Sequence, residues 1–492
     1  MLVKTARSLL LALLTASVIL AQPTPTPEYV IGGMTFQANL RARTELWDWF
    51  HADSGDHGYA YSGNILRLGL SRSTKQWDWQ AEFAVPFLLG LPSNAVAPGA
   101  QGQLGLGAAY FANSQTGSNT AMLFPKQVFW RWKNIGGVAG QSLRIGRFEY
   151  ADGTERTPQN PTLAALKRDR VAQRLIGTFA WTHVAHSFDG FQYILDKPSA
   201  TFAVVSAIPT RGVFQTDGWG ETRTAFTYAA YTRGWGGGNH VAETRVLGIY
   251  YHDWRSLVKT DSRALAVRRT DLANIRIGTF GGHHLSAFTS SAGTADILLW
   301  GVAQTGRWGT QDHRAHAFAL EGGFQPRATS GWLGHWKPWL RAGYFESSGD
   351  STPNDNAHES FFNLMPSPRP FARFPFFNLM NNRDIHAALI SRPHGRVTIS
   401  NEFHALRLSS TNDLWYIGGG VYQPWTFGYA GRAAGGARSL ANLYDVQVDY
   451  RLNPAVSVTG YFGFAQGLAV TRTIYPKGKD ARLGYVELNY RF

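Results

Sequence analysis

Single arginines flanked on both sides by apolar residues recur along this 492-residue chain. In a β-strand the side chains alternate between two faces, so such an arginine points away from its apolar neighbours. If the strand crosses a membrane, the apolar face meets lipid, where an arginine at the midplane costs about 2–4 kcal/mol. Each arginine of this kind is therefore predicted to face the interior of a barrel. Nine residues fit the pattern: Arg41, Arg67, Arg131, Arg144, Arg276, Arg341, Arg407, Arg451 and Arg491.

Acidic residues in the same segments follow the same alternation. The acids predicted to face inward are Asp78, Glu82, Asp445, Asp449 and Glu487. The predicted lining is mixed, with a surplus of arginine. Such a surplus gives a pore a positive potential that concentrates anions, and guanidinium groups bind carboxylates through two parallel hydrogen bonds. For any one arginine, an ion pair with an acid of a neighbouring strand is the simpler interpretation, so the functional prediction concerns the surplus.

The strands that would carry these residues show a period of two. Apolar and polar residues alternate in Phe36–Arg43, Trp77–Phe87, Tyr444–Arg451 and Tyr485–Phe492. Segments of about 10 residues cross a membrane as tilted strands, and residues 34–492 hold roughly 16–20 of them. Because bacterial barrels have even strand numbers, we predict an all-β fold, a transmembrane antiparallel up-and-down β-barrel of about 18 strands. A secreted soluble propeller or sandwich is the alternative, with shorter strands.

The connections between strands are expected to differ at the two ends of the barrel. Leu452–Pro454 has the composition of a short periplasmic turn. The glycine-rich stretches Gly90–Gly107, Gly234–Asn239 and Gly428–Gly436 are predicted to be longer outer loops.

The N-terminus has the character of a secretory signal. Two basic residues precede Ser8–Ala21, an apolar run of 14 residues, which is shorter than the roughly 20 residues that a membrane-spanning helix needs. A short membrane anchor is the alternative. We therefore predict a signal peptide at residues 1–21, an extended proline-spaced leader at 22–33, and the barrel at 34–492. The last residue, Phe492, ends the final strand on an aromatic side chain of the kind that the barrel-assembly machinery reads, which predicts the bacterial outer membrane.

Several other functions are disfavoured by the sequence. The formal net charge of +14 could indicate nucleic-acid binding, but the charges are spread along strands in a chain predicted to be exported. His183 and His186, like His313 and His316, are three residues apart, which on a strand places them on opposite faces, so no metal site is predicted.

Enzymatic chemistry is not predicted either. The G-x-S-x-G, H-E-x-x-H and Walker A patterns do not occur in the sequence. The carboxylates of Asp78 and Glu82, and those of Asp445 and Asp449, share a face and could suggest a glycosidase, but in an arginine-rich wall ion pairs are the better interpretation. We predict no enzymatic activity and no cofactor.

Residues 141–193 carry the most specific motif. They contain an LRIGR strand, an RLIG segment, an aromatic stretch and FDG, and they resemble the alginate-export family of bacterial outer-membrane porins. The matching residues are Arg144, Gly146, Arg147, Arg174, Leu175, Gly177, Trp181, Phe188, Asp189 and Gly190. The resemblance implies a monomeric 18-stranded barrel whose arginine-lined constriction passes polyuronates, with Arg147 and Arg174 as pore residues. In this chain residues 157–173 separate the two halves of the motif, and folding of this insertion into the pore would reshape the constriction.

A second unusual segment lies between Asp350 and Asp384. The pentapeptide FFNLM occurs there twice, at Phe361–Met365 and Phe376–Met380, on either side of a proline-rich stretch. The segment is too long for a simple hairpin. It is interpreted either as a loop that gates the pore or as a packed extracellular loop, and the sequence does not decide between them.

Together these observations predict an anion-preferring porin for carboxylated saccharides such as alginate-like polyuronates. The alternatives are a channel for other solutes, a surface glycan-binding barrel and an outer-membrane hydrolase. The expected partners are an anionic oligo- or polysaccharide, outer-membrane lipid, the assembly machinery through Phe492 and, as a further option, periplasmic export proteins, but no nucleic acid. Export and uptake are both compatible with the sequence.

Overall fold

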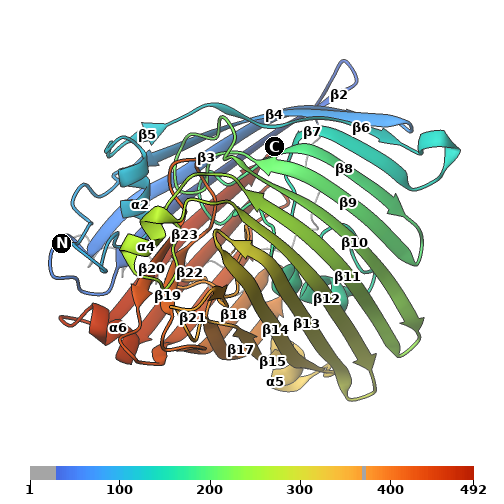
Figure 1. Cartoon of the computed structure of the whole chain (residues 1–492). Coiled ribbons are helices and arrows are strands. Elements are labelled where there is room, and N and C mark those ends of the chain that lie inside the picture. The colour runs from blue at the N-terminus through green and yellow to red at the C-terminus, as the bar shows by residue number, and fades with distance from the viewer. Residues whose placement is uncertain (1–28, 368–372) are drawn as a thin grey trace.

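A computed structural model describes residues 29–367 and 373–492, and in that part of the chain one sheet holds 21 strands. Three of them are short: β1 (Tyr29–Ile31), β5 (Thr120–Ala121) and β16 (Ala357–His358). The other eighteen form the wall of a closed barrel (Figure 1). The predicted signal peptide and most of the predicted leader lie outside the described residues.

The wall strands run antiparallel to their neighbours throughout, and the last strand pairs with the first, with Tyr490 opposite Leu40. This pairing closes the barrel and confirms the predicted fold. The wall strands are β2 (Met34–Asp48), β3 (Gly58–Ser73), β4 (Trp77–Leu89), β6 (Phe124–Lys133), β7 (Gln141–Phe148), β8 (Phe188–Asp196), β9 (Ala200–Pro209), β10 (Thr224–Gly237), β11 (His240–Asp253), β12 (Ile275–Thr289), β13 (Gly293–Trp308), β14 (Gln311–Pro326), β15 (Trp339–Ser347), β17 (Asn382–His394), β18 (Val397–Leu408), β21 (Ser439–Arg451), β22 (Val456–Gly467) and β23 (Asp480–Arg491).

Helices are few and short in the described part of the chain. They are α2 (Leu106–Asn113), α3 (Pro161–Leu166), α4 (Leu265–Thr270), α5 (Gly331–Trp336) and α6 (Ala469–Ile474), with single turns η1 (Ile135–Gly137) and η2 (Lys167–Val171). Among the described residues no helix has both the length and the apolar character that a membrane crossing requires. A separate small hairpin, β19 (Leu414–Gly418) and β20 (Tyr429–Ala433), lies near α2 and α4 at one end of the barrel, while α5 lies at the other (Figure 1).

The alternation of the sequence becomes an inner and an outer face. On β14, Ala317, Ala319 and Glu321 are buried, whereas Phe318 and Leu320 between them are exposed on the outside. The outer face offers apolar side chains to lipid and hides the polar ones. The lumen is therefore the place where charged residues collect.

The two ends of the barrel differ as expected for an outer-membrane protein. At one end the connections are as short as Gly238–Asn239 and Gly395–Arg396, and at the other they run as long as residues 149–187 and 348–381. Short turns face the periplasm and long loops face the outside in such barrels. We refer to these as the turn end and the loop end.

One prediction about the connections was wrong. Gly234–Gly237 complete strand β10, and Gly238 and Asn239 form a tight turn at the turn end, so this stretch is not an outer loop. The backbone conformation explains the glycines there, since Gly236 and Gly238 have φ angles of +88° and +61° that other residues rarely adopt. Gly90–Gly107 and Gly428–Gly436 do lie in long connections at the loop end, and Leu452–Pro454 lies in a short turn.

Long loops fold into the barrel and fill part of its lumen. Phe361–Met365, the first FFNLM copy, is almost wholly buried, and Met365 pairs with Ile176 of another loop. In the second copy Phe376 packs edge-on against Phe50 and Trp415. At the loop end the lumen is therefore filled by apolar side chains. Apolar wall residues can point inward there.

Candidate functional site

Residues 149–187, the loop between β7 and β8, fold into the lumen and are here called the constriction segment. Asn160 starts α3 by accepting hydrogen bonds from the backbone N–H groups of Thr162 and Leu163, and Pro161 occupies the first helical position, where a missing N–H costs nothing. The insertion noted in the sequence, residues 157–173, thus forms α3 and η2 inside the barrel.

Buried ion pairs attach this segment to several wall strands. Arg170 reaches Glu321 on β14 at 3.0 Å, and Lys167 reaches Glu243 on β11 at 2.6 Å. Asp152 pairs with Arg245 of β11 at 3.2 Å and also accepts the N–H groups of Leu175 and Ile176. Charges removed from water in this way require partners to remain stable. The segment is therefore fastened across the lumen at several points.

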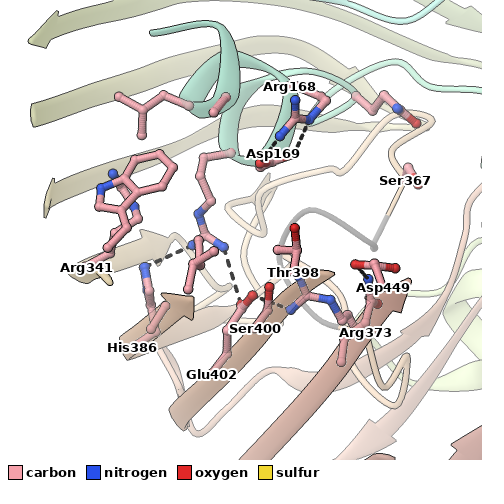
Figure 2. A pocket seen from close by; sticks show the side chains of 18 of the residues that line it. Arg168, Asp169, Arg341, Ser367, Arg373, His386, Thr398, Ser400, Glu402 and Asp449 are labelled. Atoms are coloured by element: carbon pink, nitrogen blue, oxygen red, sulfur yellow. Dashed lines mark hydrogen bonds and ion pairs between the residues drawn. The ribbon is translucent and has the colours of Figure 1, made fainter. Parts of the chain in front are cut away.

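A cavity of about 610 Å³, here called the basic cavity, lies between the constriction segment and strands β15, β17, β18 and β21 (Figure 2). Its lining includes Ile390 and Thr398 close to the β17–β18 turn, so the cavity is on the turn-end side of the segment. Five arginines and three carboxylates line it: Arg168, Arg170, Arg341, Arg373 and Arg392, with Asp169, Glu402 and Asp449. The lining has two more guanidinium groups than carboxylates.

The five arginines differ in how fully they are neutralised. Arg341 is held by Asp296 and Glu321, and Arg373 by Glu402, while Arg170 is shared between Glu321 and Glu402. These three stabilise the wall and the segment.

Arg168 and Arg392 are the arginines best placed to meet a solute. The side chain of Arg168 is 68% exposed and pairs only with its neighbour Asp169, a surface contact of small energetic value. Arg392 lies over the ring of Trp339, 5.9 Å from its centroid, and within the described residues no carboxylate lies within ion-pair distance of it. Within the described residues, Arg392 is thus the cavity arginine without a carboxylate partner, and Arg168 is the one whose partner is a solvent-exposed neighbour.

A second cavity, of about 510 Å³, lies on the loop-end side and is here called the aromatic cavity. Its ring-bearing lining residues are Trp47, Trp49, Phe179, Trp181, Phe214, Phe377, Tyr422, Phe427 and Tyr429. Trp181 lines both cavities, so the constriction segment separates them at this residue. Two wall arginines fix the backbone of the constriction segment at this point. Arg43 donates to the Trp181 carbonyl at 2.7 Å, and Arg41 donates to the Ala180 carbonyl at 2.6 Å.

Most of the charged residues that the alternation predicted to face inward do lie on the inner face. Arg41, Arg67, Arg131, Arg144 and Arg341 face the lumen, as do Asp78, Glu82, Asp445, Asp449 and Glu487. Arg67 contacts Glu82 and Glu149, and Arg131 contacts Asp78 at 2.6 Å. Arg451 and Arg491 have inward parity but lie exposed at the turn end. Most inward arginines thus belong to ion pairs of the wall.

Arg276 and Arg407 point outward, against the prediction. Ile277 and Leu406 beside them are fully buried, because at the loop end the lumen holds apolar loop residues instead of water. The apolar neighbours therefore face inward, and the arginines face outward.

The two arginines carried over from the family resemblance also occupy unexpected positions. Arg147 has the same outward parity as the exposed Ile145, and it donates to both carboxylate oxygens of Asp189 at 2.7 Å. It is not a pore residue in this structure. Arg174 does lie inside the lumen but is 1% exposed, contacts Glu321 at 3.6 Å and stacks 4.6 Å from the centroid of the Trp300 ring. It supports the constriction segment from within.

Buried histidines occur at several places in the lumen, among them the constriction segment and strands β17 and β18. His183 and His186 are buried in the constriction segment; burial lowers the pKa of each to about 4, so both rings are neutral at neutral pH. Asp384, His386 and His404 come from neighbouring strands β17 and β18, and their ligand-type atoms lie within 4.8 Å of one another. This second group was not predicted from the sequence, because only spacings within one segment were considered. His386 on β17 and His404 on β18 are direct cross-strand partners.

The loop arginines of the basic cavity were also missed. Arg168, Arg170 and Arg373 lie outside the wall strands, where no period of two exists to give their direction. Arg392 is followed by Pro393 near a strand end, where the pairing shifts register. The sequence signals were the insertion at residues 157–173, which contains Arg168 and Arg170, and the unusual segment Asp350–Asp384, which contains Arg373.

Comparison with known proteins gives the family. A family model described as alginate export matches residues 113–473, well over half of the chain. The chain belongs to the alginate-export family. This membership, together with the closed barrel, places the protein in the bacterial outer membrane as a channel-type protein.

Solved structures with a similar fold include proteins of Pseudomonas aeruginosa and Acinetobacter baumannii. OpdK of Pseudomonas aeruginosa is similar at a TM-score of 0.54 and 10% identity, covering 93% of this chain and 98% of that chain. OccAB4 of Acinetobacter baumannii is similar at a TM-score of 0.55 and 10% identity, covering 96% and 99%. At these identities the likeness shows the barrel fold alone. No curated protein matches the chain.

Proposed function

We propose that this member of the alginate-export family is an anion-preferring channel that passes carboxylated saccharides, such as alginate-like polyuronates, without enzymatic chemistry. The observation that carries the proposal is the basic cavity, where five arginines face three carboxylates next to the constriction segment. A solute carboxylate can accept two hydrogen bonds from a guanidinium, and a row of such groups permits stepwise movement because no single site holds the solute tightly.

The aromatic cavity is consistent with a saccharide cargo. A sugar ring presents C–H groups that pack on the faces of Trp and Tyr side chains, while its hydroxyl groups remain available for hydrogen bonds. Trp181 contributes to both cavities, so a chain of sugar units passing it would meet aromatic rings first and guanidinium groups next when moving inward. The order is reversed for export, and both directions agree with this arrangement.

The same aromatic lining favours a second candidate, a solute that carries a carboxylate on an aromatic ring. A structure of OpdK, which has the same fold at 11% identity, was determined with vanillate, an aromatic carboxylate. The two candidates differ in what should occupy the channel. Oligomers of uronic acid would span both cavities, whereas a single aromatic carboxylate would fit in one.

The test is block of single-channel current by solute. In phosphatidylcholine bilayers we expect uronate oligomers to block the open channel, with block that strengthens as the oligomer lengthens. Substitution of both cavity arginines best placed to meet a solute, Arg168→Gln and Arg392→Gln, should weaken block about tenfold or more, because each charge-assisted contact contributes roughly 1.5–3 kcal/mol. Equal block by neutral oligosaccharides would contradict the proposal, and block only by aromatic carboxylates would support the second candidate.

Arg276→Gln is the matched control for each single cavity substitution, Arg168→Gln or Arg392→Gln, because each of the three removes one charge. The side chain of Arg276 faces outward, away from the lumen. Arg276→Gln should leave block unchanged in a bilayer of neutral lipid. A change of similar size in this control would mean that net charge, and not the basic cavity, determines the affinity.

A further inference from the structure

Two pairs of arginines lie directly opposite each other on the outer face of the barrel. Arg276 of β12 is opposite Arg307 of β13, and Arg383 of β17 is opposite Arg407 of β18. In all four residues the side chain has outward parity, with buried neighbours such as Ile277 on the inner face. Like charges directly opposite on adjacent strands destabilise a sheet, so each pair needs a counter-charge.

In the part of the chain that the structure describes, each pair has one carboxylate at ion-pair distance. Asp312 binds Arg307 at 2.9 Å, and Glu346 binds Arg383 at 2.7 Å. Within the described residues no carboxylate lies within ion-pair distance of Arg276 or Arg407. The same half-neutralised arrangement thus occurs twice, with one arginine of each pair left to find an anion elsewhere.

The pairs lie where the apolar outer face ends. Moving along the same strands toward the turn end, the outward residues become apolar and exposed: Phe280 on β12, Leu299 on β13, Ile385 on β17 and Phe403 on β18. Moving the other way, the strands end within a few residues and the loop end begins. An outward arginine is tolerated at such a boundary, where its cost falls to about 0–1 kcal/mol. The boundary at the loop end corresponds to the headgroups of the outer leaflet.

We infer that the Arg276–Arg307 and Arg383–Arg407 pairs bind phosphate groups of a phosphorylated glycolipid in the outer leaflet. A phosphate placed between two guanidinium groups accepts hydrogen bonds from both and removes their mutual repulsion. Cross-strand neighbours have Cβ atoms about 4.5–5.5 Å apart, a separation that two long arginine side chains can close around one anion. The acyl chains of the same lipid would lie against the apolar residues below. The inference goes beyond transport and does not depend on the solute.

The test is lipid binding to the purified full-length barrel in a neutral detergent, measured by native mass spectrometry. The two probes are diphosphoryl lipid A and the same lipid with both phosphates removed. We expect the diphosphoryl form to bind at least tenfold more tightly. Arg276→Gln and Arg407→Gln should each weaken its binding about fivefold, in line with the value of one basic residue at an anionic lipid surface.

Two further variants test whether binding depends on the paired arginines and on the shape of the guanidinium group. Arg482→Gln also removes an outward, exposed arginine, but Arg482 pairs with Asp48 and has no arginine opposite it, so binding should not change. Arg276→Lys retains the charge but loses the planar fork and should restore only part of the affinity. Equal binding of the two lipids, or an equal loss in Arg482→Gln, would overturn the inference. Heat-dependent gel mobility verifies that every variant has formed the barrel.

Discussion

Arg170 of the constriction segment donates to both carboxylate oxygens of Glu321 on strand β14, with its Nε 3.2 and 3.0 Å from them. Glu321 also receives Arg341 at 3.1 Å and lies 3.6 Å from Arg174. One carboxylate that is 1% exposed therefore joins two arginines of the lumen-filling segment to one arginine of the wall. Glu321 is thus one point at which the constriction segment is attached to the wall, through Arg170 and Arg174.

Replacing that carboxylate should destabilise the barrel. Glu321→Gln leaves three buried guanidinium groups short of a counter-charge, and breaking buried pairs of this type costs about 3–5 kcal/mol. We expect the free energy of unfolding, measured with urea on the barrel in lipid vesicles, to fall by that amount. Asp312→Asn is the control, because it breaks an ion pair whose members are 59% and 52% exposed, and it should cost less than about 1 kcal/mol. Similar losses in both variants would show that Glu321 has no special role.

Removing the loop that carries both FFNLM copies should open the lumen. Ser347 and Asn382 are hydrogen-bonded to each other at the base of this loop, so residues 350–380 can be replaced by a short glycine linker without separating β15 from β17. Since Phe361–Met365 is buried inside the barrel, we expect a single-channel conductance several-fold above that of the intact protein. Unchanged conductance would contradict a role in gating. Loss of saccharide binding with unchanged conductance would instead support a surface glycan binder.

Loop packing should depend on pH through Asp350. Its carboxyl group is buried beside Asp413, and burial raises its pKa to about 6. A carboxyl whose pKa is raised in the folded state stabilises that state while protonated, and this contribution disappears as the pH rises through the folded pKa. We expect the loops to pack most firmly below about pH 4, to loosen as the pH rises from about 4 to about 6, and to change little above about pH 6.5.

Limited proteolysis of the loop end at several pH values measures this effect. Cleavage in residues 348–381, measured with proteases active in acid, should accelerate between about pH 4 and pH 6.5 in the natural protein. The variant Asp350→Asn is neutral at every pH and should show a nearly flat profile. A steep profile that persists in Asp350→Asn would assign the pH dependence to another group.

A period of two predicts the direction of a wall side chain in some parts of the barrel and not in others. In the middle of the wall the alternation gave correct directions for Arg67, Arg131 and Glu82, because lipid lies on one side and polar groups on the other. Near the loop end it failed for Arg276 and Arg407, because buried loop residues make the inner face apolar as well. Alternation indicates that two faces differ, and it identifies the lipid side only where the lumen is polar.

Most residues of the basic cavity could not be predicted from the sequence, because their positions depend on the packing of loops inside the barrel. Arg168 and Arg170 belong to a loop whose path is set by contacts with distant strands, and such contacts leave no local pattern in the sequence. The family resemblance located the right segment, since residues 141–193 border and include the constriction. It assigned the wrong arginine to the pore, because Arg147 is satisfied by Asp189 on the outer face.

The central claim is that the lumen prefers anions because of the arginine surplus in the basic cavity. The most direct measurement is the reversal potential of the purified channel in a neutral bilayer that separates two concentrations of potassium chloride. We predict a potential of the sign that indicates chloride over potassium permeability, with the preference reduced by Arg168→Gln and Arg392→Gln together and unchanged by Arg276→Gln. A reversal potential that indicates potassium over chloride permeability in the natural protein would contradict the account.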